Sequence, residues 1–233
     1  MNLTDDMVEY YNRRKFPLGV EFPGFFATGR NFLGAERFLI AFHRDPSLIQ
    51  EIMDFWGGFV VATLEKVVDQ VEIDFALSWE DMAYGKGPHI SPQLFREFLQ
   101  PQYRKVTGML RRKGVDIIIV DSDGNIEPLI TPLLESGVNG ILPLEAGAGM
   151  NVVSLREKYG KSLRMIGKID KKALLAGPEA ISKEVESKVP KLMDQGGYIP
   201  SIDHEVPEDV PLSNYSYYTS LLKRICSGQQ IGL

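Results

Sequence analysis

The chain has 233 residues and a formal net charge of −5 at pH 7. With 44% hydrophobic and 24% charged residues, its composition is that of a globular protein and excludes a disordered or fibrous one. The acidic balance argues against a nucleic-acid partner, which would require a basic face. We expect one domain over residues 1–233, because this length suits a single barrel.

The first predicted elements are a short strand and a long helix. Apolar residues from Phe16 to Val20 indicate a strand, and Pro23-Gly24 marks the loop that follows. Asp45-Pro46 is typical of an N-cap followed by proline in the first helical turn. The apolar residues after it recur at helical spacing and predict a helix to about Gln70.

The rest of the chain repeats this alternation of strand and helix. Residues 73–79 are strand-like, and Ser91-Pro92 begins a helix that Gly114 ends. The run from Val115 to Val120 is typical of a parallel strand covered on both faces. Further helices are predicted at 127–136, 152–159, 178–194 and 211–226, and further strands at 138–143, 163–169 and 197–202.

This order of elements predicts an α/β fold of the (β/α)8 TIM-barrel type, in which the chemistry lies at the carboxyl ends of the strands. The pattern gives about six parallel strands, whereas a closed barrel of this kind needs eight. We therefore expect an incomplete barrel with unpaired strand edges, which proteins normally cover. Residues 1–15, a second copy in a homo-oligomer or another chain would cover them.

Nearly every predicted strand is followed by an acidic residue. The strand ends of a barrel meet at one mouth, so these side chains should converge. Like charges in a half-buried pocket repel one another, and a divalent metal, a proton or a cationic substrate usually offsets them. The pattern therefore predicts the active site of an enzyme. The segments concerned are Trp79-Glu80-Asp81, Val120-Asp121-Ser122-Asp123, Leu144-Glu145, Ile169-Asp170 and Ile202-Asp203-His204.

The segment Asp121-Ser122-Asp123-Gly124-Asn125 directly follows the clearest predicted strand. Two carboxylates at i and i+2 of an extended segment point the same way, and glycine allows a sharp turn beside them. The pair could bind a metal or divide the roles of acid and base. The alternative interpretation is an Asp-rich turn that caps the next helix.

A second candidate is His204, which lies beside Asp203 after the last predicted strand. It could act as a metal ligand, as a general acid or base, or as a hydrogen-bond donor to a substrate carboxylate. Glu145 precedes a glycine-rich segment, residues 146–149, that would let a ligand approach the backbone. This segment does not match the G-x-G-x-x-G pattern, so a nicotinamide cofactor is not supported.

Cysteine and apolar content indicate the compartment. Cys226 is the only cysteine, which excludes an intrachain disulfide and a cysteine-rich zinc site and fits a reducing, cytoplasmic setting. Residues 1–11 contain three acids and no long apolar run, so an ordinary signal peptide is not expected. No stretch reaches the roughly 18 to 20 apolar residues that a membrane span requires, and we expect no membrane partner.

Several segments are also similar to the sequence motifs of a known family. Residues 19–28 are similar to an Ile-Gly-Phe-x-Gly-x-Pro-x-Thr region, and residues 198–207 are similar to Gly-His-Gly-x-x-Pro. The other segments are Ile90-Ser91-Pro92-Gln93-Leu94-Phe95, Pro101-Gln102-Tyr103 and Gly167-Lys168-Ile169-Asp170. In these motifs and their order along the chain, the protein resembles the uroporphyrinogen decarboxylase superfamily, which includes corrinoid-dependent methyltransferases. The likeness extends from about Pro17 to Leu222.

The resemblance implies methyl transfer between a small methylated donor and a corrinoid protein. In the zinc methyltransferases of this superfamily, His-x-Cys after one strand and Cys after the last strand bind zinc. The matching positions here are Asp121, Asp123 and His204, so the implied site has oxygen and nitrogen ligands, for zinc or another divalent metal. The chain lacks the Asp-x-His-x-x-Gly corrinoid signature, so the corrinoid would arrive on a partner protein.

These inferences assign a role to each candidate. We expect the catalytic residues to be Asp123, His204 and Glu145. We expect the residues that contact substrate to be Glu80, Asp81, Asn125, Asp170 and Asp203.

Two alternatives stay open. One is decarboxylation of a tetrapyrrole, in which His204 would match the substrate-contacting histidine of the decarboxylases. Their arginine-rich segment and catalytic aspartate have no counterpart before Phe16, and an acidic mouth suits a substrate with many carboxylates poorly. The other is a non-catalytic truncated barrel that binds a ligand or partner, because the first two barrel strands of the family would also precede Phe16.

Overall fold

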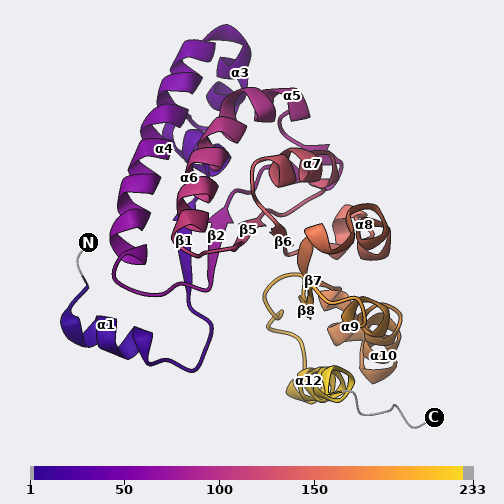
Figure 1. Ribbon diagram of the computed structural model, residues 1–233. Coiled ribbons are helices and arrows are strands. Elements are labelled where there is room, and N and C mark those ends of the chain that lie inside the picture. The colour runs from indigo at the N-terminus through magenta and orange to yellow at the C-terminus, as the bar shows by residue number, and fades with distance from the viewer. Residues whose placement is uncertain (1–2, 228–233) are drawn as a thin grey trace.

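The computed structural model describes residues 3–227, which form a six-stranded parallel sheet with helices against it (Figure 1). The strands lie side by side in chain order, so each parallel pair is joined by a helical crossover. The strands of this sheet are β1 (Gly19–Pro23), β2 (Phe75–Trp79), β5 (Ile117–Asp121), β6 (Gly140–Leu142), β7 (Arg164–Ile169) and β8 (Tyr198–Ile202). A separate two-stranded hairpin consists of β3 (Ala83–Tyr84) and β4 (Gly87–Pro88).

The helices pack on one face of this sheet. In β2, Ala76 and Ser78 are fully buried beneath them, whereas the alternate residues Phe75, Leu77 and Trp79 are only half-buried on the other face. The longer helices are α1 (Asp5–Asn12), α2 (Phe25–Leu33), α3 (Ala35–Arg44), α4 (Pro46–Val68), α6 (Gln100–Arg112), α7 (Glu127–Glu135), α8 (Val152–Tyr159), α10 (Pro178–Glu186) and α12 (Leu212–Cys226). The shorter ones are α5 (Pro92–Leu94), a π-helical turn (Phe95–Leu99), α9 (Lys171–Ala176), α11 (Val189–Met193) and two 3-10 turns (Ala146–Ala148 and Gly160–Ser162).

The sheet has two free edges. Within residues 3–227, β1 pairs only with β2 and β8 pairs only with β7, so the barrel does not close. Ile199 of β8 is 59% exposed, which shows how open the inner face is at that edge. The prediction of an incomplete TIM-barrel-like α/β fold with six parallel strands is confirmed.

The N-terminal third differs from the sequence-based expectation. The first strand lies at Gly19–Pro23 and not at 16–20, and the predicted loop after it forms α2 and α3. The N-terminal cap of α2 is provided by Glu80, a residue 55 positions away, so no local signal announces this helix. The helix predicted at 178–194 is divided into α10 and α11, and Pro190, in the first turn of α11, lacks the backbone N–H that a continuous helix would use.

Other local signals act as predicted. The carboxylate of Asp45 accepts a hydrogen bond from Leu48 N at 3.1 Å, and the Ser91 hydroxyl accepts one from Leu94 N at 3.1 Å, so each caps the helix that follows it. No helix in the part of the chain that the structure describes is long and apolar enough to cross a membrane.

A buried carboxylate fixes α2 on the end of β2. Glu80 is fully buried and accepts hydrogen bonds from Phe25 N and Ala27 N, both at 2.9 Å, and from the Tyr103 hydroxyl. A Cβ on Gly24 would lie 2.1 Å from the Glu80 carboxyl carbon, so only glycine fits there. The carboxylate therefore satisfies the free N–H groups of the first turn of α2, where the helix dipole favours negative charge.

Replacing Glu80 by glutamine is expected to flatten the pH dependence of stability. Burial raises the pKa of Glu80 from 4.5 to about 7, although its hydrogen bonds oppose this rise. A group whose pKa is higher in the folded state contributes stability below its unfolded pKa and loses it as pH rises through the folded value. The free energy of unfolding should therefore lose roughly 3 kcal/mol from this group between about pH 4.5 and 7.5.

Urea denaturation at a series of pH values measures this loss. The Glu80→Gln variant should lack this component, whereas the Glu36→Gln variant, changed at an exposed position on α3, should keep the wild-type slope. Parallel curves for the wild type and Glu80→Gln would contradict the expectation.

Candidate functional site

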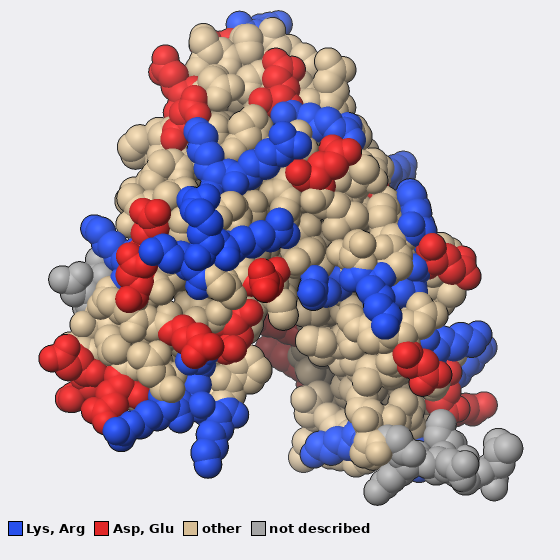
Figure 2. Space-filling model, viewed as in Figure 1, with Lys and Arg blue, Asp and Glu red and all other residues tan. Residues whose placement is uncertain are grey.

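A pocket of about 420 Å³ lies at the carboxyl ends of the strands. Segments that are distant in the sequence meet there because the parallel strands all end at this side of the sheet. Figure 2 shows a separate feature, a hollow between the parts of the surface that carry α1 and α12, with acidic side chains visible at its back. The pocket is lined by Trp79, Asp81, Asp121, Asp123, Leu142, Pro143, Ile202, Asp203, His204 and Glu205.

The centre of this pocket is an imidazole between two carboxylates. His204 Nε2 lies 3.3 Å from Asp123 Oδ1, and His204 Nδ1 lies 3.6 Å from Asp203 Oδ1. Nδ1 is buried and has no hydrogen-bond partner among residues 3–227. The structure therefore brings together the two strongest candidates of the sequence, the Asp pair after β5 and the histidine after β8.

The carboxylates of the Asp pair hold protons more tightly than usual. Burial and, after it, the negative charges of Asp123, Asp81 and Glu21 raise the pKa of Asp121 to about 6, and His204 opposes this rise. Burial also raises the pKa of Asp123, against the opposing effect of His204. Acids of this kind can carry a proton near neutral pH, as general acids must.

The turn after the Asp pair is fixed from both sides. Gly124 has φ of +77°, and a Cβ there would lie 2.5 Å from Tyr84 N in the β3–β4 hairpin. Gly124 N donates to Glu145 Oε2 at 2.9 Å, and Asn125 N donates to Tyr84 O at 2.9 Å. The close approach of the hairpin explains why this position is glycine.

Four of the residues expected at the site do not line the pocket. Glu80 is buried under α2, as described above, and Glu145 is bound to Gly124. Asp170 caps α9 by accepting from Lys172 N at 2.8 Å, and Asn125 accepts from Glu127 N at 3.0 Å at the start of α7. The helix-capping alternative for the Asp-rich turn is thus realised by Asn125, while the two aspartates face the pocket.

Asp203 lines the pocket and also holds the backbone around it. Its Oδ2 accepts from Ala146 N at 2.8 Å, and its Oδ1 accepts from Lys171 N at 3.3 Å. It therefore ties the segment after β6 and the start of α9 to the end of β8. The carboxylate held in this way lies 3.6 Å from His204 Nδ1.

Sequence reasoning missed one cation at the mouth. Arg30 of α2 donates from Nη1 to Asp81 O at 3.1 Å, and its Nη2 lies 3.8 Å from Asp81 Oδ2. Its guanidinium lies 5.7 Å from the centre of the Trp79 ring, within cation–π range. Asp81 has φ of +50°, and the bonds from Arg30 hold this left-handed residue. Sequence reasoning could not place Arg30 at the site, because the segment that forms α2 was predicted to be a loop.

The metal expected at Asp121, Asp123 and His204 stays a prediction. Among the residues of the described range, 3–227, no group of three or more His, Cys, Asp or Glu side chains is arranged to hold a metal ion. The residues present therefore do not form a metal site as they stand, and the chemistry below is derived from the side chains alone.

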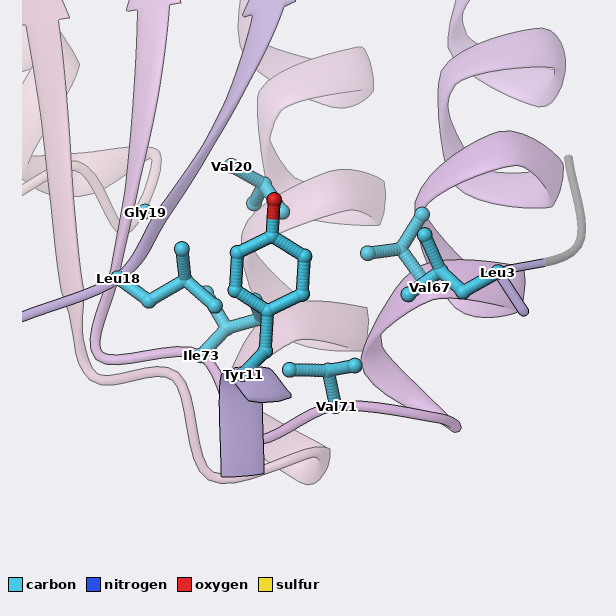
Figure 3. Close-up of a pocket in the computed structure, with 8 residues that line it drawn as sticks. All are labelled: Leu3, Tyr11, Leu18, Gly19, Val20, Val67, Val71 and Ile73. Carbon is cyan, nitrogen blue, oxygen red and sulfur yellow. The ribbon is translucent and has the colours of Figure 1, made fainter. Parts of the chain in front are cut away.

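A second pocket, of about 190 Å³, lies at the opposite end of β1 (Figure 3). The Tyr11 ring stands in it, between Leu18 and Ile73 of the sheet side and Val67 of α4. Its lining is apolar apart from the Tyr11 hydroxyl, so it holds no set of groups for acid–base or metal chemistry. This second pocket therefore offers no alternative site for the acid–base chemistry of the strand ends.

Comparisons with known proteins bear on the family and the fold. Residues 24–225 match the family model described as uroporphyrinogen decarboxylase. Among solved structures, a methyltransferase from Methanosarcina mazei superposes with a TM-score of 0.70 at 16% sequence identity, over 94% of this chain. The chain spans 61% of the length of that methyltransferase, and at this identity the likeness shows the fold alone. A search of curated proteins finds no significant match.

Removing His204 is expected to raise the pKa of both Asp121 and Asp123. The imidazole lowers each of these values, so the His204→Ala variant loses a partner that favours the carboxylate form. Carboxyl carbon NMR titration of the two aspartates measures the change. The His43→Ala variant, altered at an exposed position of α3, is the control and should leave both values in place. A lower or unchanged pKa at both aspartates in His204→Ala would refute the arrangement.

Proposed function

Because the chain belongs to the uroporphyrinogen decarboxylase family, we propose that it is a methyltransferase that moves a methyl group between a small methylated donor and a corrinoid protein. The observation that carries this proposal is the meeting of Asp121, Asp123 and His204 in one pocket at the strand ends. The fold likeness to a methyltransferase supports it.

The main chemical task is protonation of the leaving group. When a methyl group leaves a donor, the heteroatom to which it was bound becomes a poor leaving group unless it gains a proton. Asp121, with a pKa of about 6, carries that proton in an appreciable fraction of molecules near neutral pH. It passes the proton to the heteroatom as the carbon–heteroatom bond breaks, and solvent restores it afterwards.

The neighbouring residues set the protonation state of Asp121. The charge of Asp123 raises the pKa of Asp121, and His204 holds Asp123 at 3.3 Å. The Asp203 carboxylate, held by Ala146 N and Lys171 N, lies 3.6 Å from Nδ1 of the imidazole. Removing any of these groups would change the pKa of the acid or its position relative to the donor.

The cofactors of this proposal come from outside the chain. The corrinoid on the partner protein supplies the cobalt centre that exchanges the methyl group. A divalent metal, zinc among them, stays a prediction that metal content measures directly, in the native chain and in the Asp123→Ala and His204→Ala variants.

The acidic character of the pocket separates this proposal from its alternatives. A tetrapyrrole with many carboxylates would meet Asp81, Asp121, Asp123 and Asp203 at the mouth, which is electrostatically unfavourable. A barrel that binds without turnover would show no reaction with any methylated donor. Decarboxylation of a tetrapyrrole would point to the first of the two alternatives, and a defined complex without reaction would point to the non-catalytic barrel.

Asp121→Asn, Asp123→Asn and His204→Ala are each expected to slow methyl transfer by roughly 100- to 10,000-fold, the range for loss of general acid–base catalysis. The assay follows transfer from a panel of N-, O- and S-methylated compounds to reduced cobalamin by absorbance. His43→Ala should keep wild-type activity, because its side chain is exposed and distant from the pocket in sequence and fold. Unchanged rates in His204→Ala and Asp121→Asn would defeat the proposal.

The pH dependence of the reaction provides a separate check. If Asp121 donates the proton, its protonated fraction falls as pH rises above about 6, so the rate should fall by about tenfold per pH unit beyond that value. The Asp121→Asn variant should lack this limb of the profile. A rate that is flat between about pH 6 and 8 in the wild type would exclude Asp121 as the acid.

A further inference from the structure

The helix α4 has an apolar face that nothing in residues 3–227 covers. Its core side is buried through Ile49, Met53, Val60 and Leu64. The opposite side of a surface helix normally carries charged residues. Here it carries large apolar side chains at helical spacing, with Phe55 65% exposed and Phe59 51% exposed. We define the aromatic face as Ile52, Phe55, Trp56 and Phe59 of α4 together with Phe32 of α2.

The rings of this face form one continuous surface. Phe32 meets Trp56 edge-on with ring centres 6.1 Å apart, and Trp56 stacks on Phe59 at 5.1 Å. Trp56 Nε1 donates to Pro23 O at 2.9 Å, which joins the aromatic face to the end of β1. β1 is also a free edge of the sheet, and in Figure 1 α4 and β1 lie on the same flank. One side of the molecule thus presents both apolar rings and unpaired backbone groups.

The exposed apolar area of the aromatic face is large enough to form part of a protein interface. A phenylalanine offers roughly 200 Å², so the exposed fractions of Phe32 (55%), Phe55 and Phe59 together give about 340 Å² from three rings. The largest apolar patch on a typical monomer is about 300 to 600 Å² and is often functional. A stable interface buries about 800 Å² on each partner, of which these rings would supply roughly two fifths.

The charges that flank the aromatic face indicate its occupant. Glu51 lies before it and Lys66 after it on α4, and neither side chain forms an ion pair within the described range. If two α4 helices pack antiparallel about a two-fold axis at Phe59, Lys66 of one copy falls opposite Ile52 of the other and beside its Glu51. The helix dipoles also oppose in this arrangement, which favours it. The face is therefore complementary to itself, as a two-fold interface requires.

We propose that a second copy of this chain covers the aromatic face, with the two α4 helices antiparallel and Phe59 at the centre. The contact stacks apolar rings in the middle and places two Glu51–Lys66 pairs at the ends. It lies on the helical flank of the molecule and leaves the pocket at the strand ends open. The inference is independent of the reaction proposed above.

The first test is the oligomeric state of the full chain by sedimentation equilibrium over a range of concentrations. The wild type should form a dimer, and Phe59→Ser should raise its Kd by about tenfold or more. Leu212→Ser is the matched control, since Leu212 is 78% exposed on α12, away from α4, and should leave the Kd unchanged. Phe59 is half exposed, so the variant should fold, and an unchanged thermal melting curve of its monomer checks this.

The second test is a charge exchange that only the antiparallel arrangement explains. Glu51→Lys alone and Lys66→Glu alone should each raise the Kd by roughly threefold or more at low salt, because each creates two like-charged contacts per dimer. The double variant should regain the wild-type Kd. A mixture of the two single variants should also form a tight heterodimer, because one copy then carries two lysines and the other two glutamates at these positions.

Three outcomes would overturn the proposal. A wild-type chain that stays monomeric at all concentrations would exclude a second copy as the occupant. A dimer that Phe59→Ser leaves intact would place the interface elsewhere. A dimer that Phe59→Ser disrupts but that shows no rescue in the charge exchange would exclude the antiparallel alignment.

Discussion

The common direction of the six strands is the constraint on which the rest of this structure depends. In register, Trp79 of β2 lies beside Asp121 of β5, and Asp121 lies beside Leu142 of β6. All three line the pocket, because parallel strands in register end at the same level. On the far side, β8 ends next to β7 and brings Asp203 and His204 to the same mouth. Strand direction and register therefore determine where the pocket forms, and single side chains determine only its lining.

Backbone hydrogen bonds then divide the acids at the strand ends into two groups. Glu80, Glu145 and Asp170 accept from backbone N–H groups and so stabilise α2, the Gly124 turn and α9. Such bonds satisfy a carboxylate and remove it from chemistry with a ligand. Asp121 and Asp123 have no such role, and burial together with neighbouring negative charges raises their pKa values. The two acids whose carboxylates accept no backbone hydrogen bond are therefore the ones best suited to proton transfer.

The one-sided packing of the helices explains both unusual surfaces of the molecule. Because helices cover a single face of an open sheet, the inner face is partly exposed, and the surface is hollowed between α1 and α12 (Figure 2). The same openness leaves α4 at the end of the helical layer, with no neighbouring helix beyond it within residues 3–227. Its second apolar face, centred on Phe59, is what an interior helix of a longer layer would bury. The open pocket and the exposed aromatic face thus arise from one architectural feature.

The sequence by itself determined the order of strands and helices, the parallel sheet and the gathering of acids at its carboxyl edge, because hydrophobic periodicity and cap residues act locally. It also predicted that Asp121, Asp123 and His204 would lie at this edge, and all three line the pocket there. The tertiary structure alone decided which acids face the pocket, since the partners of Glu80 and Asp203 lie more than one element away in the chain. It likewise decided that residues 25–44 form two helices and that Arg30 reaches Asp81, because a cap or ion pair between distant segments leaves no pattern within either one.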